Sequence, residues 1–177
     1  MTLILIAFCC ISPLYGQNQR APININLIID GSSSLVNVKT DATDWVIGRL
    51  DQILADGDTL TIWSAGASAG IIYTGTINSA ADTESAKRSL RELSVSGSSA
   101  DFSGALRDAA GRGTSSAFTY TLLISASQES LSSTISGSAG NLLRFSRVEE
   151  FSGWRALVVG LDLDARVRRA AASFFGN

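Results

Sequence analysis

Short apolar segments rich in β-branched residues alternate along this chain with segments of helical periodicity. The apolar segments predict strands at residues 23–29, 59–65, 71–77, 119–125 and 155–161. The amphipathic segments predict helices at residues 40–54, 83–95, 101–110, 141–150 and 164–175. Such alternation favours an α/β fold: a doubly wound, mostly parallel sheet with helices on both faces.

The second and third predicted strands are separated only by the small-residue segment 66–70. A connection this short favours an antiparallel hairpin, so we expect one antiparallel strand at the edge of the sheet. Two serine-rich segments, 96–99 and 132–138, predict flexible loops.

The length and composition fit one exported domain of ordinary size. The chain has 177 residues, of which 45% are hydrophobic, and its formal charge is −2 from 14 basic and 16 acidic residues. A weakly acidic chain does not suit nucleic-acid binding. The chain has no histidine, which excludes a Ser-His-Asp triad, a Cys-His pair and any histidine-ligated metal.

The N-terminal segment predicts export. An apolar run at 3–11 is followed by Pro13 and Gly16, a pattern typical of a signal peptide spanning 1–16. Residues 17–22 then form a short linker, and 23–177 the domain, located in the periplasm or secreted. Both cysteines, Cys9 and Cys10, lie in this segment, and acylation of one of them to give a lipid anchor is the alternative.

A carboxylate and two hydroxyls follow the first predicted strand at two-residue intervals: Asp30, Ser32 and Ser34. Ligands of doubly wound sheets bind at the carboxyl ends of the strands, and hard cations such as Mg²⁺ prefer oxygen ligands. The pattern therefore indicates a candidate divalent-metal site. Its simpler interpretation is a turn of small polar residues that caps the next helix.

The segment 30–34 resembles the DxSxS signature of the metal-ion-dependent adhesion site of von Willebrand factor A domains. Residues 101–106 are similar to the end of the family's TDxxxAL motif, and 122–129 to its following strand and loop. Residues 154–162 resemble the next strand. The resemblance covers nearly all of 23–175 and implies a Rossmann-like von Willebrand factor A fold.

Two family ligand positions lack an oxygen in this sequence. Ala100 stands where the family has a coordinating threonine, and Ala126 where it has an aspartate. The resemblance then leaves a degenerate site of Asp30, Ser32 and Ser34, which binds Mg²⁺ or another divalent cation weakly or not at all. Nearby side chains that could partly compensate are Ser99, Asp101, Ser125 and Ser127. Asp101 has an alternative role as the N-cap of its helix.

The resemblance implies a non-catalytic protein-binding or scaffold module. Its partner would be another protein, of the cell envelope or the extracellular space, and membrane contact would come only through that partner or a lipid anchor. We expect the partner at a rim of loops that carries Gly97, Ser98, Ser99, Ser127 and Glu129.

Two alternatives stand beside the binding module. A magnesium-dependent phosphatase could use Asp30 as its nucleophile, but Ser32 occupies the position where that chemistry needs a second acid. The chain could also be a purely structural subunit of an envelope assembly with no ligand of its own.

Overall fold

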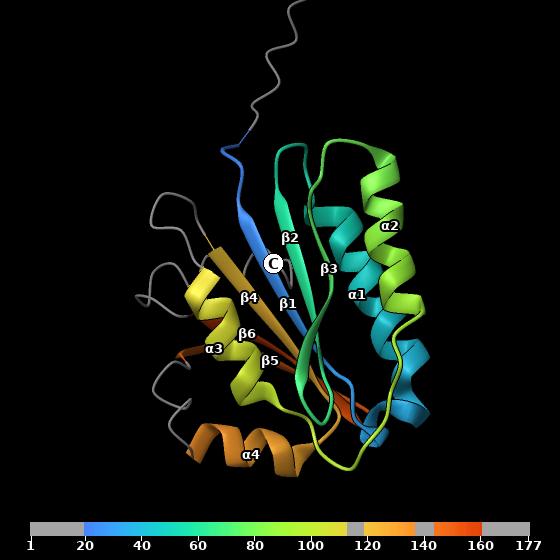
Figure 1. Ribbon diagram of the computed structural model, residues 1–177, viewed down its shortest axis with the longest axis vertical. Coiled ribbons are helices and arrows are strands. Elements are labelled where there is room, and N and C mark those ends of the chain that lie inside the picture. Colours follow the sequence, from blue (N-terminus) through green and yellow to red (C-terminus); the bar gives the residue numbers. More distant parts are fainter. Residues whose placement is uncertain (1–19, 113–118, 137–143, 161–177) are drawn as a thin grey trace, which may run out of the picture.

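A computed structural model describes residues 20–112, 119–136 and 144–160 (Figure 1). In this part of the chain, six strands form one sheet in the order β3-β2-β1-β4-β6-β5. The strands are β1 Asn24–Asp30, β2 Thr59–Ala65, β3 Ala69–Thr76, β4 Thr119–Ser125, β5 Arg144–Phe151 and β6 Trp154–Gly160. The helices are the 3₁₀ helix η1 Ser33–Val38, α1 Lys39–Ile53, α2 Ala80–Arg91, α3 Phe102–Arg112 and α4 Gln128–Ser136.

The predicted fold class is confirmed by the strand order. Strand β1 pairs in parallel with β2 on one side and with β4 on the other, and β3 is an antiparallel edge strand beside β2. Strands β1, β2, β4 and β5 run in one direction, whereas β3 and β6 run in the other. The sheet is thus mostly parallel, with two reversed strands rather than the single one expected.

The second reversed strand results from a segment whose predicted structure was wrong. Residues 141–150 were predicted to be helical, but Arg144–Phe151 is strand β5, which pairs antiparallel with β6. The turn between them contains Gly153 with a φ of 88°, a conformation that favours glycine. A connection this tight returns the chain beside itself, so no crossover helix separates the two strands.

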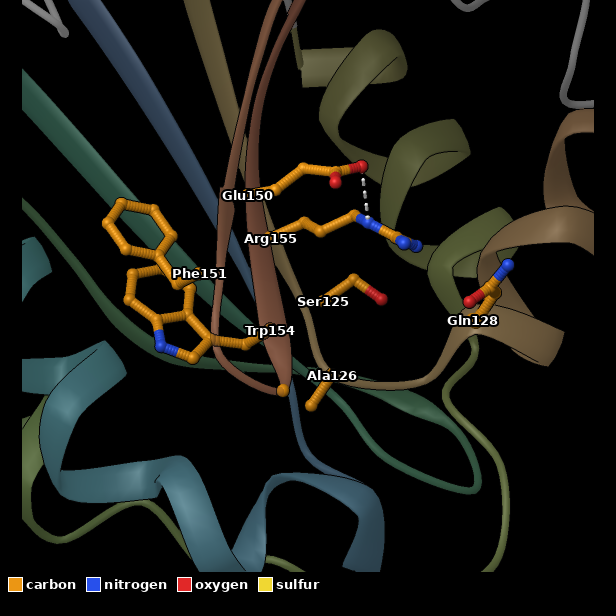
Figure 2. A pocket seen from close by; sticks show the side chains of 8 residues that line it. Ser125, Ala126, Gln128, Glu150, Phe151, Trp154 and Arg155 are labelled. Atoms are coloured by element: carbon orange, nitrogen blue, oxygen red, sulfur yellow. Dashed lines mark hydrogen bonds and ion pairs between the residues drawn. The ribbon is translucent and has the colours of Figure 1, made fainter.

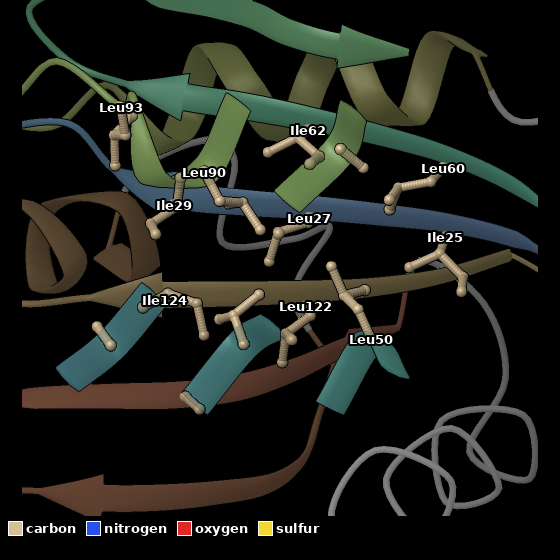
Figure 3. Packing of buried hydrophobic residues seen from close by; sticks show 14 of the residues in the cluster. Ile25, Leu27, Ile29, Leu50, Leu60, Ile62, Leu90, Leu93, Leu122 and Ile124 are labelled. Carbon is tan, nitrogen blue, oxygen red and sulfur yellow. The ribbon is translucent and has the colours of Figure 1, made fainter. Parts of the chain in front are cut away.

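Alternating side chains of the strands form two apolar layers. Helices α1 and α2 cover one face, where Ile25, Leu27 and Ile29 of β1 pack with Leu50 and Leu90 (Figure 3). Helix α3 lies against the other face (Figure 1). That second layer includes Ile28, Trp63, Phe102, Leu106 and Leu123.

The serine-rich segment 132–138 was predicted to be a flexible loop, yet helix α4 continues to Ser136. Thr134 Oγ1 donates a hydrogen bond to the carbonyl of Ser130, and Ser136 Oγ donates one to that of Ser132. Such back-bonding lets hydroxyl side chains occupy a helix. The predicted segments 1–16 and 164–175 lie outside the described residues. Among the helices that the structure describes, none is long and apolar enough to cross a membrane.

A buried tryptophan anchors α3 to the sheet through an exposed carboxylate. Trp63 Nε1 donates a 2.8 Å hydrogen bond to Asp108 Oδ2, and Arg112 pairs with the same oxygen at 3.2 Å. The indole hydrogen bond, followed by the Arg112 charge, holds the pKa of Asp108 below its ordinary value. The ionised form is therefore favoured in the folded protein.

We expect the stability advantage of the wild type over Asp108→Asn to depend on pH. A carboxyl whose folded pKa is lowered stabilises the protein above its unfolded value, about 3.9 for aspartate. That contribution disappears as the pH falls through the lower folded value. Urea unfolding of both proteins between about pH 7 and pH 2 measures the difference. A difference that stays constant over this range would contradict the assignment.

Candidate functional site

The carboxylate of Asp30 lies at the end of the central strand β1, and its residue is fully buried. Its Oδ1 accepts hydrogen bonds from the Ser32 amide (2.8 Å) and the Ser32 hydroxyl (2.7 Å). Its Oδ2 accepts from the amides of Ala126 and Ser127, both at 2.9 Å. The side chain therefore joins the loop after β1 to the loop between β4 and α4, and four donors from the chain satisfy it.

The three predicted metal ligands differ in their exposure to solvent. Asp30 and Ser32 lie together and are fully buried, and the hydroxyl proton of Ser32 is donated to Asp30. Ser34 lies within η1 and is exposed. The predicted trio is thus divided between a buried hydrogen-bonded pair and one surface hydroxyl.

The loop at 96–99 packs directly on the loop after β1. The amide of Ser96 donates to the carbonyl of Gly31 (2.8 Å), and the amide of Ser33 donates to the carbonyl of Gly97 (2.9 Å). Gly97 has a φ of 80°, which favours glycine at this point. At Gly31, a Cβ would lie 2.4 Å from Ser64 Oγ and 3.0 Å from the backbone nitrogen of Gly66, so the close approach of the loop after β2 favours glycine there as well.

The structure places Asp101 as the N-cap of α3. Its Oδ1 accepts a 2.8 Å hydrogen bond from the Gly104 amide, three residues into the helix. Its Oδ2 accepts a long hydrogen bond from the Ala69 amide (3.4 Å), which connects the β2–β3 hairpin to the start of α3. Both carboxylate oxygens are engaged, so the capping role explains this residue without a metal.

The two alanines at family ligand positions are structural. Ala100 is 7% exposed and packs in the layer beneath α3, while its amide donates to Ser130 Oγ. Ala126 uses its amide to bind Asp30. Within the described residues, no three histidine, cysteine, aspartate or glutamate side chains are grouped as a metal site. The chemistry of this donor set therefore does not fit a tightly bound Mg²⁺.

The hydroxyls expected to compensate are also engaged. Ser125 Oγ donates to the carbonyl of Ser127, and Ser127 Oγ accepts from the amide of Ser130, as the N-cap of α4. Ser127 is only 7% exposed, so its side chain does not belong to the accessible rim. Ser99, which makes no such contact in the described structure, is exposed.

The other predicted rim residues, Gly97, Ser98, Ser99 and Glu129, are exposed at the carboxyl edge of the sheet. The structure adds Val36, whose side chain is 54% exposed in η1. The sequence analysis did not identify Val36. A signal was present, because Leu35 and Val36 are adjacent and only one of two adjacent side chains in a helical turn can point inward. We call the exposed residues Ser34, Val36, Gly97, Ser98, Ser99 and Glu129 the rim surface.

A hollow of about 220 Å³ lies beside the rim surface, between the end of β4 and the β5–β6 hairpin. Figure 2 shows Arg155 and Ser125 projecting to one side of the hairpin, with Phe151 and Trp154 on the other. The aromatic rings are stacked with centroids 3.9 Å apart, and Arg155 Nε pairs with Glu150 Oε1 at 3.1 Å. Of the lining side chains, Ser125 donates its hydroxyl hydrogen bond to the carbonyl of Ser127, and Glu150 is paired with Arg155.

No model of a known protein family matches this chain, and no curated protein matches it. Among solved structures, the chain is similar to a von Willebrand factor type A protein from Catenulispora acidiphila, with 20% identity and a TM-score of 0.49. That match covers 56% of this chain and 25% of the other.

The chain is also similar to the three N-terminal domains of the type V pili tip protein Mfa5 from Porphyromonas gingivalis. The identity is 17% and the TM-score 0.47, over 58% of this chain and 19% of the other. This chain thus matches a quarter or less of either protein. A von Willebrand factor type A protein is among the structures that it resembles, while the α/β assignment itself rests on the strand order and packing described above.

Proposed function

We propose that this chain is an exported, non-catalytic module that binds another protein through the rim surface without a metal ion. The observation that carries the proposal is the set of four hydrogen bonds around Asp30. They connect two of the rim loops through hydrogen bonds within the chain. A preorganised loop edge at the carboxyl end of a sheet is where binding residues commonly lie.

The character of the rim surface supports a protein partner. Its exposed side chains are hydroxyls, one aliphatic group and one carboxylate, Glu129. Recognition would then depend on shape and neutral hydrogen bonds more than on charge, and we expect binding to vary little with salt. We propose a partner in the envelope or outside the cell, because the apolar N-terminal run favours export.

The phosphatase alternative is disfavoured by the surroundings of Asp30. A nucleophilic carboxylate must present a free oxygen to the phosphorus, but both oxygens of this fully buried side chain accept hydrogen bonds from the chain. The second acid is replaced by Ser32, which donates to Asp30. A purely structural role is the remaining alternative, and the following experiment distinguishes it from protein binding at the rim surface.

Affinity capture from an envelope extract of the producing organism tests the proposal. The wild type is compared with Ser98→Arg, which places a bulky charge on the rim surface, and with Ser85→Arg on the exposed side of α2 as the matched control. We expect Ser98→Arg to lose a partner that the wild type and the control retain equally, with or without EDTA. Capture that Ser98→Arg leaves unchanged would favour a role elsewhere on the surface.

A further inference from the structure

Hydroxyl and amide side chains form an ordered array at the opposite end of the sheet from the rim surface. Three strands carry Thr-x-Thr and the central strand carries Asn-x-Asn, and the strand register aligns them. The outer row is Thr76, Thr59, Asn24 and Thr119, and the inner row is Thr74, Thr61, Asn26 and Thr121. We call these eight residues the Thr/Asn array.

Strand geometry places the members of the array on one face. Directly paired residues in neighbouring strands point to the same side, with the strands about 4.8 Å apart, and residues two apart along a strand are separated by about 6.6 Å. The array continues the face on which Ile28, Trp63 and Leu123 pack beneath α3. Helix α3 lies against the lower part of this face in Figure 1. The same face is therefore apolar beneath the helix and polar beyond it.

Three of the four inner-row residues, Asn26, Thr61 and Thr121, are buried, whereas Thr74 is exposed, and the row leaves hydrogen-bonding capacity. Asn26 is 6% and Thr61 8% exposed. Asn26 Nδ2 makes a long 3.4 Å bond to Thr121 Oγ1, and Thr61 Oγ1 lies 3.1 Å from Thr74 Oγ1. A carboxamide offers two donors and an acceptor, and a hydroxyl a donor and two lone pairs. These internal bonds occupy only part of that capacity, so the row can also bind a polar group above it.

A cavity of about 350 Å³ lies over the array, lined by residues that include Asn24, Asn26, Thr59, Thr61 and Thr119. Arg112, in the last turn of α3, forms part of the wall. Its Nε pairs with Asp108 at 3.2 Å, and its side chain is half-exposed. A cavity floored by hydroxyls and amides, with a guanidinium at one side, suits a ligand with several hydroxyls and one anionic group.

We propose that this cavity binds an acidic saccharide unit. The threonine and asparagine side chains bind the sugar hydroxyls, because both partners donate and accept. The Nη groups of Arg112 bind the carboxylate, as guanidinium groups do in forked geometry. A nucleic acid is disfavoured, since a single arginine among the described lining residues gives no track for a phosphate backbone. The site lies at the opposite end of the strands from the rim surface and does not depend on the proposed function.

A saccharide array that pairs uronic and sialic acid glycans with their neutral counterparts tests the site in the full chain. We expect the wild type to retain acidic glycans, and Arg112→Gln to reduce their retention about ten-fold, since a charged hydrogen bond is lost. Thr59→Val keeps the β-branched shape and removes one hydroxyl, so it is expected to weaken binding by several-fold.

Two control variants distinguish the loss of a contact in the cavity from the loss of a charge or hydroxyl elsewhere on the surface. Arg107→Gln removes an exposed charge from the same helix, outside the cavity lining, and Thr40→Val removes an exposed hydroxyl from α1. Both should retain acidic glycans like the wild type. The absence of retention by the wild type, equal retention of neutral glycans, or equal losses in Arg107→Gln and Arg112→Gln would overturn the proposal.

Discussion

Replacing Asp30 by alanine is expected to lower the free energy of unfolding by about 3 kcal/mol or more in the presence of EDTA. The change leaves the amides of Ala126 and Ser127 and both donors of Ser32 without their acceptor. Each unsatisfied buried donor costs about 1 to 3 kcal/mol, although the costs are not additive. Urea unfolding followed by circular dichroism measures the loss.

Asp30→Asn should be nearly as harmful as Asp30→Ala. An amide retains one oxygen, but its NH₂ group faces the donors on the other side. Ser34→Ala is the control, because it removes an exposed hydroxyl of the same sequence pattern and should change stability by less than about 0.5 kcal/mol. If Asp30→Asn stabilises the protein in EDTA, the wild-type carboxylate is destabilising without a bound cation, and Asp30 is a metal ligand rather than a hydrogen-bonded structural residue.

Asp58→Ala is the second change with a large expected effect, about 2 to 4 kcal/mol of lost stability, because two backbone amides lose their acceptor. Asp58 is fully buried in the turn before β2. Its Oδ1 accepts from Arg20 Nη1 (2.8 Å) and the Ile23 amide (3.0 Å), and its Oδ2 accepts from Arg20 Nη2 and the Ala55 amide. The hydrogen bonds to Asp58 raise the pKa of Arg20. This carboxylate joins the segment before β1 to the turn after α1.

Two further variants define the contribution of each partner. Arg20→Ala should cost less than Asp58→Ala, because the arginine side chain is 42% exposed and Asp58 keeps two amide donors. Asp56→Ala in the same turn is the control, since Asp56 is exposed. Thermal unfolding at neutral pH should show the largest loss of stability for Asp58→Ala, a smaller loss for Arg20→Ala and the smallest for Asp56→Ala. A loss for Asp56→Ala as large as that for Asp58→Ala would mean that the effect comes from the turn itself and not from the buried Asp58 carboxylate and its donors.

The sequence predicted the strands best where both faces are buried. Residues 23–29 and 119–125 are rich in apolar and β-branched residues, and both form central strands. It failed at Arg144–Phe151, where charged and apolar residues fit either periodicity over so short a span. There the strand conformation depends on the turn at Gly153, which brings β5 beside β6. Such a tertiary contact is invisible to local periodicity.

The sequence indicated which residue types stand at the candidate site, but not where their side chains point. Ala100 and Ala126 indicated from the sequence that a metal would lack ligands there. The sequence could not show that Asp30 points inward to the amides of Ala126 and Ser127, because those contacts span more than ninety residues. The Thr/Asn array was missed for the same reason. Each Thr-x-Thr is unremarkable alone, and only the register of four strands aligns them.

Calorimetric titration of the protein with MgCl₂, from micromolar to about 10 mM, tests whether the rim loops are held without a metal ion. The melting temperature is measured in EDTA and in about 10 mM MgCl₂. Because the chain's own donors satisfy the Asp30 carboxylate, we predict no saturable heat at micromolar concentrations and the same melting temperature in EDTA and in MgCl₂. Saturable micromolar binding that Ser34→Ala abolishes, with a higher melting temperature in MgCl₂, would contradict a rim held together by hydrogen bonds alone.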